Sequence, residues 1–308
     1  MTRRADVHVG RLFPLLLVAG VVAAVAVAAL LAACGGSSGG SPEPSATVTA
    51  PASASASPSL SPTASTSPTT APQPVTVYFM RDGALCAAER LADDQSSAAT
   101  LRALLRGPTA EEAAAGVASD IPRGVRLLEY SEDGDRAIVD LSSAYSRSGD
   151  EAQVKDRLAQ VVYTVTGMGD GAATRVVLRL NGVPIDGMPS QAGDVEYFPT
   201  RAGYRELEPA IFVEHPGLGA VLSSPATLSG TASVSEGAFT ARLVDGSGRR
   251  IVSVPVQASR GAPGRGRFSR ELAFSTSSAA GTLIVYSESM EDGSRQNVVS
   301  IPVTFATP

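Results

Sequence analysis

The chain has few of the residues from which metal sites and disulfide frameworks are built. Its 308 residues include two cysteines, two histidines, one lysine and no tryptophan. Two cysteines cannot form a framework of disulfides. The formal net charge of −5 argues against a nucleic-acid-binding protein, which would normally carry a basic field. The length predicts about two domains.

Charged residues are also absent from one long stretch near the N-terminus. Arg3, Arg4 and Arg11 precede residues 12–33, an uncharged apolar run of 22 residues. A basic segment followed by an apolar one is typical of a secretory signal. The run is also long enough to span a bilayer, so an uncleaved membrane anchor is the alternative. In both cases the positive-inside rule predicts that the remainder of the chain lies outside the cytoplasm.

The apolar run ends in the motif Leu31-Ala32-Ala33-Cys34, which two glycines follow. This motif resembles the bacterial lipobox, in which a strongly nucleophilic thiol takes up the lipid and small residues before it admit the signal peptidase. The resemblance implies that Leu31, Ala32 and Ala33 are recognised by the peptidase, that residues 1–33 are removed, and that Cys34 carries diacylglycerol and palmitate. We therefore expect a lipoprotein anchored at the extracytoplasmic face of the cell membrane.

Residues 34–74 contain almost nothing that a folded core could bury. From Ser41 onward nearly every residue is serine, threonine, proline or alanine. Such a composition does not compensate the entropy lost on folding, so we expect a disordered tether. A plain spacer is the simpler interpretation, and an O-glycosylated stalk is the alternative.

Residues 75–190 mix helix and strand signals and predict an α+β domain. A short helix over residues 98–106 should end at Gly107-Pro108. A second helix should begin at Thr109, where Glu112 completes a capping box. The longest helix is expected over residues 150–166, where apolar residues recur at the helical period. Strands are expected at residues 75–79, 125–130, 137–141 and 174–180.

Several ordered motifs in this domain resemble a known family. They are Leu104-Leu105-x-Gly107-Pro108-x3-Glu112, Gly116, Ser119, Ile121-Pro122 and the hairpin that ends in Val139-Asp140-Leu141-Ser142. Together they resemble the GerMN domain, which is named for sporulation and spore-germination proteins and also occurs in actinobacterial lipoproteins. The resemblance implies no known reaction, so it supplies no catalytic residue.

The C-terminal part shows a different pattern. Residues 191–208 form a connector whose Tyr197, Phe198 and Tyr204 are expected to pack against or between the domains; an aromatic ligand site is the alternative. Residues 209–308 contain about seven short strands separated by turns and no helical period. This spacing predicts an all-β, immunoglobulin-like sandwich.

The turns of this second segment also resemble a family. The motifs are His215-Pro216, Ser224-Pro225, Leu228-Ser229-Gly230-Thr231-Ala232, Asp245-Gly-x-Gly, Asp292-Gly293 and Ile301-Pro302-Val303. They resemble the immunoglobulin-like Gmad domain, which accompanies GerMN in bacterial spore-germination-type proteins. The resemblance implies an extracytoplasmic sandwich that binds a ligand or a partner.

The sequence offers little material for catalysis. His215 and Cys86 lie in different predicted domains, and a nucleophile and its base must lie within hydrogen-bonding reach. We expect a turn histidine and a small buried apolar cysteine. The loops at Asp245 and Asp292 lack the ligand spacing of an EF-hand and are explained as turns. We therefore expect no catalytic residue, no metal site and no cofactor.

A group of arginines stands out on this acidic chain. Arg260, Arg265, Arg267 and Arg270 lie close behind Arg249-Arg250. Such a group could bind an anionic wall polymer or lipid headgroups, although a solvated hairpin is the simpler explanation.

These observations favour a non-catalytic, lipid-anchored binding or scaffold protein of the cell envelope. Its expected partners are the membrane, through the N-terminal lipid, and an envelope protein or peptidoglycan, but no nucleic acid. Two alternatives are a peptidoglycan-modifying enzyme and a transporter-linked solute-binding lipoprotein. The second alternative would require two lobes of βα units, whereas residues 209–308 show strands alone.

Overall fold

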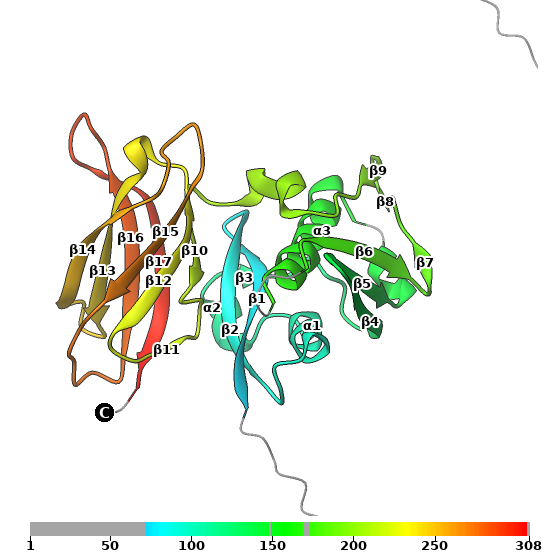
Figure 1. Cartoon of the computed structure of the whole chain (residues 1–308), viewed down its shortest axis with the longest axis horizontal. Helices are drawn as coiled ribbons and strands as arrows, with labels where there is room; N and C mark the ends of the chain where they lie inside the picture. The colour runs from blue at the N-terminus through cyan, green and yellow to red at the C-terminus, as the bar shows by residue number, and fades with distance from the viewer. Residues whose placement is uncertain (1–71, 148, 169–172, 307–308) are drawn as a thin grey trace, which may run out of the picture. The chain divides into compact units, whose positions relative to one another are not determined.

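The computed structural model describes residues 72–147, 149–168 and 173–306 (Figure 1). The expected signal sequence, the lipobox that ends at Cys34, and the tether as far as residue 71 lie outside these residues. Within the described part of the chain, no helix combines the length and the apolar character needed to cross a bilayer.

The first domain opens with a hairpin. Strands β1 (Gln73–Arg81) and β2 (Ala84–Ala92) pair antiparallel along their whole lengths. Asp82 and Gly83 both have positive φ, which matches the turn of a two-residue hairpin to the twist of its strands. Strand β1 starts at Gln73, so its first two residues lie within residues 34–74, the range that the sequence predicts as a tether. The short β3 (Val117–Ala118) pairs with the other side of β1, so β2 lies at the edge of this sheet.

A second sheet of the first domain has the strand order β4-β5-β6-β7. The predicted hairpin forms between β4 and β5, and β5 pairs in parallel with β6. Parallel neighbours need a long crossover connection, which here contains the longest helix of the domain. The elements of this sheet are β4 (Leu127–Asp133), β5 (Arg136–Leu141), the 3-10 turn η1 (Ser143–Ser146), β6 (Arg175–Leu180) and β7 (Val183–Pro184).

The first two helices begin where the sequence places capping residues. Helix α1 (Ser97–Leu105) is capped by the Ser96 hydroxyl, which accepts a backbone N–H of the first turn. Helix α2 (Ala110–Ala114) has the predicted capping box, in which Thr109 and Glu112 each accept a backbone N–H of the other. These local hydrogen bonds satisfy donors that the helix itself leaves free.

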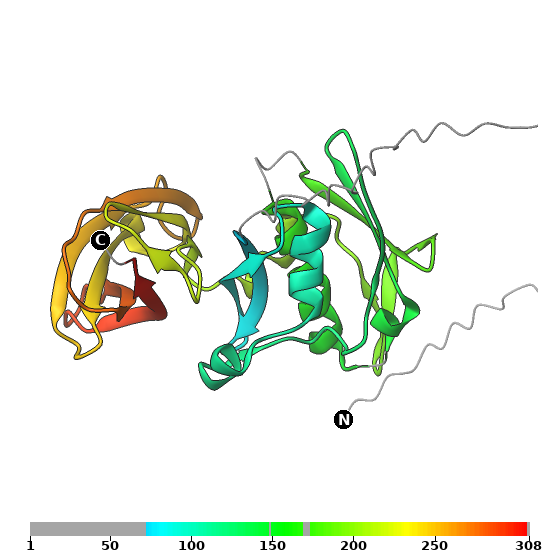
Figure 2. The ribbon, with the colours of Figure 1, turned by 90° about the horizontal axis from the view of Figure 1, so that it is seen from below.

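The long helix α3 (Glu151–Thr166) lies with α1 between the two sheets (Figure 2). Because both of its faces are covered, its buried residues extend beyond the single apolar stripe that the sequence predicts. The buried polar side chains of α3 form hydrogen bonds with neighbouring segments. Gln160 accepts the Ser119 hydroxyl at 2.8 Å, and Arg157 donates to the carbonyl oxygens of Tyr145 and Arg147.

The segment expected to be a connector belongs structurally to the first domain. A hairpin of β8 (Gly187–Ser190) and β9 (Gly193–Glu196) crosses the expected boundary at residue 190, and the 3-10 turn η2 (Arg201–Leu207) follows. Tyr204 is fully buried, and Tyr197 donates its hydroxyl to a backbone carbonyl of β6 at 2.7 Å. The aromatic residues thus pack onto the domain, as their number suggests.

The second domain is an immunoglobulin-like sandwich of two sheets. All seven expected strands are present among the described residues, together with the short β11. Phe239 and Phe268 come from opposite sheets and meet in the core, with ring centroids 4.9 Å apart. One sheet contains β10 (Ile211–His215), β12 (Ala226–Ala232) and β15 (Gly266–Leu272), and the other contains β11 (Val221–Leu222), β17 (Arg295–Phe305), β16 (Ala280–Glu288), β13 (Ala238–Asp245) and β14 (Arg250–Gln257), with the 3-10 turn η3 (Ser235–Gly237) before β13.

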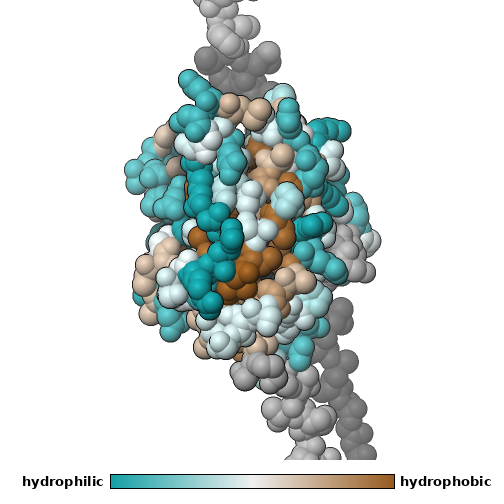
Figure 3. Space-filling model, turned by 90° about the vertical axis from the view of Figure 1, so that its left-hand side faces the viewer, coloured by the Kyte–Doolittle hydropathy of each residue, from teal (hydrophilic) through white to brown (hydrophobic). Residues whose placement is uncertain are grey.

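The outer strand β14 leaves part of the core visible from outside. Figure 3 shows apolar side chains gathered on this side of the molecule, with hydrophilic side chains around them. Val252 and Val254 are register partners of the buried Leu243 and Ala241, so they face the core, yet both remain partly exposed. An edge strand has no neighbour on its second side, which explains this exposure.

Candidate functional site

The two domains belong to one compact unit and are joined by backbone hydrogen bonds. Ala88 of the edge strand β2 forms a parallel bridge with Leu218, in the loop that follows β10. The N–H of Glu89 donates to the Leu218 carbonyl at 2.8 Å, and the N–H of Leu218 donates to the Ala87 carbonyl at 2.9 Å. The edge of the first sheet is therefore partly covered by the second domain.

A seam of three buried aromatic residues and a partly buried ion pair continues this contact: Tyr78, Tyr163, Phe212, Arg201 and Glu214. The rings of Tyr78, Tyr163 and Phe212 pack at centroid distances of 5.7 to 5.9 Å, in tilted and edge-to-face arrangements that suit their quadrupoles. Phe212 comes from β10, whereas both tyrosines come from the first domain. Each domain thus supplies part of one aromatic cluster.

Arg201 connects this cluster to polar groups. Its guanidinium lies 4.7 Å from the ring centroid of Tyr163 and donates to Glu214 at 2.5 Å and to the Thr166 hydroxyl at 2.7 Å. Burial disfavours its charge, but Tyr78 and Glu214 outweigh burial, so the pKa of Arg201 is raised. Burial also raises the pKa of Tyr78, which keeps its hydroxyl protonated to donate to Glu214 at 2.8 Å.

A β-bulge directs Glu214 toward Arg201. The register between β10 and β12 shifts between Val213 and His215, so Glu214 is the extra residue of its strand. Such a bulge re-aims the side chain at its position. The opposite residue, Gly230, makes this possible because a Cβ there would lie 2.0 Å from the carbonyl oxygen of Phe212.

A second ion pair lies beside the seam. Arg265 Nε is 2.8 Å from Glu208 Oε2, and both side chains are largely buried, with exposed fractions of 18% and 8%. The guanidinium also donates to the carbonyl of Pro209 at 2.9 Å and to the Thr231 hydroxyl at 3.2 Å. The second carboxylate oxygen of Glu208 accepts the hydroxyl of Tyr163 at 2.5 Å. Glu208 therefore binds groups from both domains.

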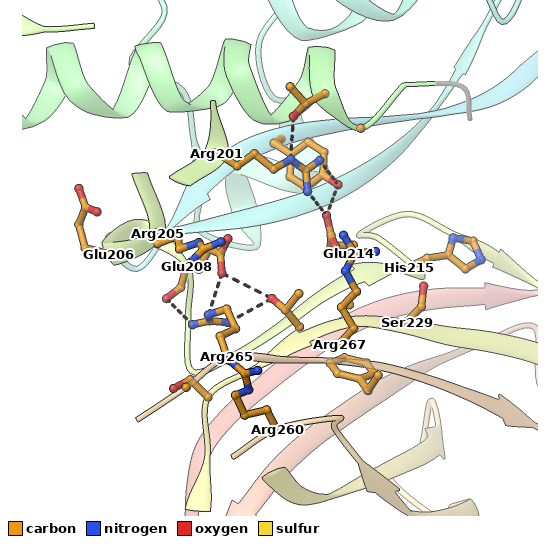
Figure 4. A pocket seen from close by; sticks show the side chains of 18 of the residues that line it. Arg201, Arg205, Glu206, Glu208, Glu214, His215, Ser229, Arg260, Arg265 and Arg267 are labelled. Atoms are coloured by element: carbon orange, nitrogen blue, oxygen red, sulfur yellow. Dashed lines mark hydrogen bonds and ion pairs between the residues drawn. The ribbon is translucent and has the colours of Figure 1, made fainter. Parts of the chain in front are cut away.

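A polar cleft of about 1070 Å³ opens over these pairs (Figure 4). Besides Arg201 and Arg265, three exposed arginines line it, and the described residues give their side chains no ion pair or hydrogen bond. We call Arg205, Arg260 and Arg267 the open mouth of the cleft. Arg205 comes from η2 of the first domain, and the other two come from the second.

The loop before β15 holds two of these arginines by its backbone. The N–H of Ser259 donates to the Arg267 carbonyl at 2.8 Å, and the N–H of Arg267 donates to the Ser259 hydroxyl at 3.0 Å. Gly266 allows the loop to fold back, since a Cβ there would lie 2.2 Å from the backbone nitrogen of Arg260. The backbone of Arg267 is therefore held by hydrogen bonds and that of Arg260 packs closely on Gly266, while the described residues give neither side chain a hydrogen bond or ion pair.

The four arginines singled out in the sequence have different surroundings. Arg260, Arg265 and Arg267 line the cleft, whereas Arg270 is exposed on β15 outside it. Arg265 forms an ion pair with Glu208, so its charge is less available to a ligand than the charges of Arg260 and Arg267. Sequence reasoning missed Arg201 and Arg205, which only the fold brings to this place.

The two candidate reactive side chains do not form a catalytic pair. His215 Nδ1 lies 2.9 Å from Glu89 Oε1, and this hydrogen bond raises the pKa of the imidazole. Cys86 is partly buried on β2 opposite Phe79, and burial raises the pKa of its thiol to about 12. A reactive cysteine needs a lowered pKa, so this environment is unsuited to nucleophilic attack.

The Asp245 loop is explained by turn chemistry. Its carboxylate accepts the Ser247 hydroxyl at 2.6 Å and the backbone N–H groups of Ser247 and Arg249, both at 3.0 Å, and these hydrogen bonds lower its pKa to about 2. Over the residues that the structure describes, no three histidine, cysteine, aspartate or glutamate side chains are grouped to hold a metal ion.

The fold defines a chain with an α+β domain followed by an immunoglobulin-like sandwich, and comparisons with known families agree. Residues 70–186 match the family Germane, described as "Sporulation and spore germination". Residues 210–294 match Gmad2, described as "Immunoglobulin-like domain of bacterial spore germination". The chain thus carries both domains that its motifs predict, in the predicted order.

Solved structures from Bacillus subtilis are also similar to the chain. The first GerMN domain of the sporulation protein GerM shows 21% identity and a TM-score of 0.35, and the match covers 42% of this chain and 96% of that one. The tandem GerMN domains of the same protein show 15% identity and a TM-score of 0.36, with 67% of this chain and 63% of that chain covered. No curated protein matches the chain.

Proposed function

We propose that this chain is exported, anchored through a lipid on Cys34, and binds a component of the cell envelope without catalysing a reaction. The component would be a partner protein or peptidoglycan. The observation that carries the proposal is the polar cleft, because residues of both domains line it and no described residue pairs with the three arginines of its mouth. The sporulation and spore-germination families of both domains support an envelope role.

The environments of His215 and Cys86 favour binding over catalysis. General acid–base or nucleophilic chemistry requires groups with suitable pKa values within reach of each other. His215 is held by Glu89, and the thiol of Cys86 is almost fully protonated at neutral pH. Zymography with purified protein should therefore show no cleared band on peptidoglycan, and a cleared band would contradict the non-catalytic part of the proposal.

The anchor is tested by replacing the lipid-accepting thiol. Cys34→Ser should block lipid attachment, so metabolic labelling with a fatty acid should be lost and unanchored protein should be released from the membrane fraction. Cys86→Ser is the matched control, since it removes the other thiol and should leave labelling unchanged. If Cys34→Ser protein still pellets with membranes and keeps residues 1–33, an uncleaved anchor replaces the lipid anchor.

The binding role is tested by crosslinking in intact envelopes. A photoreactive residue at Ser233, which lines the cleft, should give discrete crosslinked products. The same residue at Leu128 is the control, because its side chain is exposed on β4 away from the cleft. Equal product patterns at both positions, or none at either, would contradict a specific envelope partner at the cleft.

A further inference from the structure

The acceptor side chains of the cleft are already occupied. Glu208 pairs with Arg265, and Glu214 pairs with Arg201. Glu206, the third carboxylate of the lining, pairs with Lys155 at 2.5 Å. A ligand rich in hydrogen-bond donors or positive charge would have to displace these partners.

Of the five arginines that line the cleft, only Arg201 and Arg265 pair with a carboxylate in the described structure. The arginines of the open mouth have no carboxylate partner within the described residues, and all three are exposed. They therefore concentrate positive charge at one place on a chain whose formal net charge is −5. Ser229 and Ser233, which also line the cleft, add neutral hydroxyl groups.

This combination fits a particular ligand chemistry. A guanidinium presents a rigid fork of donors that matches the oxygens of a phosphate group. One phosphate needs only one or two such forks, whereas a cleft of about 1070 Å³ with three free arginines has room for several linked groups. Lining from both domains also suits an extended ligand that runs along their junction.

We propose that the cleft binds a phosphodiester-bearing ligand through Arg205, Arg260 and Arg267. This inference rests on the proposed envelope-binding function and names the chemistry of what is bound. The phosphodiester could belong to an anionic wall polymer or to a lipid headgroup. Arg201 and Arg265 would shape the cleft through their ion pairs without giving up those partners to the ligand.

The first test measures binding of inorganic polyphosphate to the purified full chain by titration calorimetry, because its linked phosphates carry one negative charge each, as those of a phosphodiester chain do. Loss of one charge-assisted contact should weaken affinity roughly tenfold, and the triple variant R205S/R260S/R267S should lose on the order of a hundredfold or more. The matched control R123S/R250S/R270S removes the same charge from three exposed arginines outside the cleft. It should lose no more than a few fold, through weaker long-range attraction.

Two outcomes would overturn the proposal. One is that the unmodified chain shows no measurable binding, and the other is that both triple variants weaken binding equally. Because the substituted side chains are exposed and unpaired, both variants should unfold at the temperature of the unmodified chain. This measurement separates lost binding from lost folding.

The source of the phosphodiester is resolved by two further probes. One is a soluble glycerol phosphate polymer, and the other is phosphatidylglycerol in phosphatidylcholine vesicles. The probe whose binding is lost in R205S/R260S/R267S and kept in R123S/R250S/R270S identifies the source, and absence of such a difference with both probes overturns the proposal. If these probes fail while Ser233 still crosslinks to an envelope component, the ligand chemistry is wrong and the proposed function stands.

Discussion

The buried seam and the open mouth use arginine in opposite ways. In the seam, Arg201 contacts two tyrosine rings and Glu214, and the exposed fractions of the paired side chains are 27% and 26%. In the mouth, Arg205, Arg260 and Arg267 are exposed and have no ion pair in the described structure. The same side chain therefore holds the domains together in one region and remains available in the other.

The cost of removing charge from water explains this difference. A guanidinium taken out of water must regain hydrogen bonds and an opposite charge, which the seam supplies with Glu214 and the Tyr163 carbonyl. An exposed arginine keeps its water and needs no partner. Stability should therefore depend on the seam and ligand binding on the mouth.

The largest effect is expected for Phe212→Ala. Phe212 is fully buried against Tyr78 and Tyr163, so its removal leaves a cavity at the junction of both domains. Loss of a buried phenylalanine typically costs about 3–5 kcal/mol of unfolding free energy. Urea unfolding followed by circular dichroism measures it. Val221→Ala is the control, because its side chain is 65% exposed and should change stability by less than about 0.5 kcal/mol.

The next effect concerns the reactivity of Cys86, which lies on the same strand as the domain bridge. The thiolate is the reacting form, and a pKa raised from 9.0 to about 12 lowers its amount roughly a thousandfold at neutral pH. Iodoacetamide labelling, followed by mass spectrometry of each cysteine-containing peptide, should be slow for native Cys86 and fast in urea. A cysteine introduced by Ser253→Cys at an exposed position of β14 is the control. Equally fast labelling of both sites would show that the thiol of Cys86 is not held in the buried surroundings that raise its pKa.

Removing the carboxylate of the seam should have a smaller effect on stability. Glu214→Gln keeps the size of the side chain but leaves Arg201 without its charged partner, at an expected cost of about 1–3 kcal/mol. The control Asp133→Asn breaks the surface pair with Arg136, whose side chains are more than half exposed, and should cost less than about 1 kcal/mol. If the two variants lose equal stability in urea unfolding, Arg201 is no more dependent on its partner than a surface arginine.

Local signals explain how much of the fold the sequence predicts. The capping box at Thr109 and the turns at Asp82-Gly83 and Asn181-Gly182 act over a few residues, so their positions can be read directly. Strand β2 was not expected, because residues 84–92 are rich in alanine and carry no alternating pattern. Its strand conformation follows from pairing with β1, which overrides local propensity.

The candidate site was predictable only where its residues are neighbours in sequence. Arg260, Arg265 and Arg267 lie within one loop and strand, so their charge is visible as a cluster. The hydrogen bond between Tyr78 and Glu214 joins residues 136 positions apart, and no local pattern predicts it. Arg201 was missed for the same reason, since its partners lie on β1, α3 and β10, three segments far apart in the sequence.

The smallest effect on stability is expected for the hydrogen bond between His215 and Glu89, which lies beside the seam. The hydrogen bond to Glu89 raises the folded-state pKa of His215 above its ordinary value of 6.5, because the protonated imidazole is the better donor. The resulting stability is fully present below about pH 6.5 and is lost as the pH rises through the raised pKa. Because the His215 side chain is half exposed, the contribution should stay below about 1 kcal/mol.

His215→Gln measures this contribution as the difference in unfolding free energy from the unmodified chain. The difference should be largest near pH 6 and should shrink toward pH 9, in the direction that a raised histidine pKa requires. Glu89→Gln is the matched control, because an amide oxygen at this position can still accept the N–H of Gly217, while the charge that favours protonated His215 is gone. A difference that is constant with pH, or that grows as the pH rises, would place His215 outside the interactions that hold the seam closed.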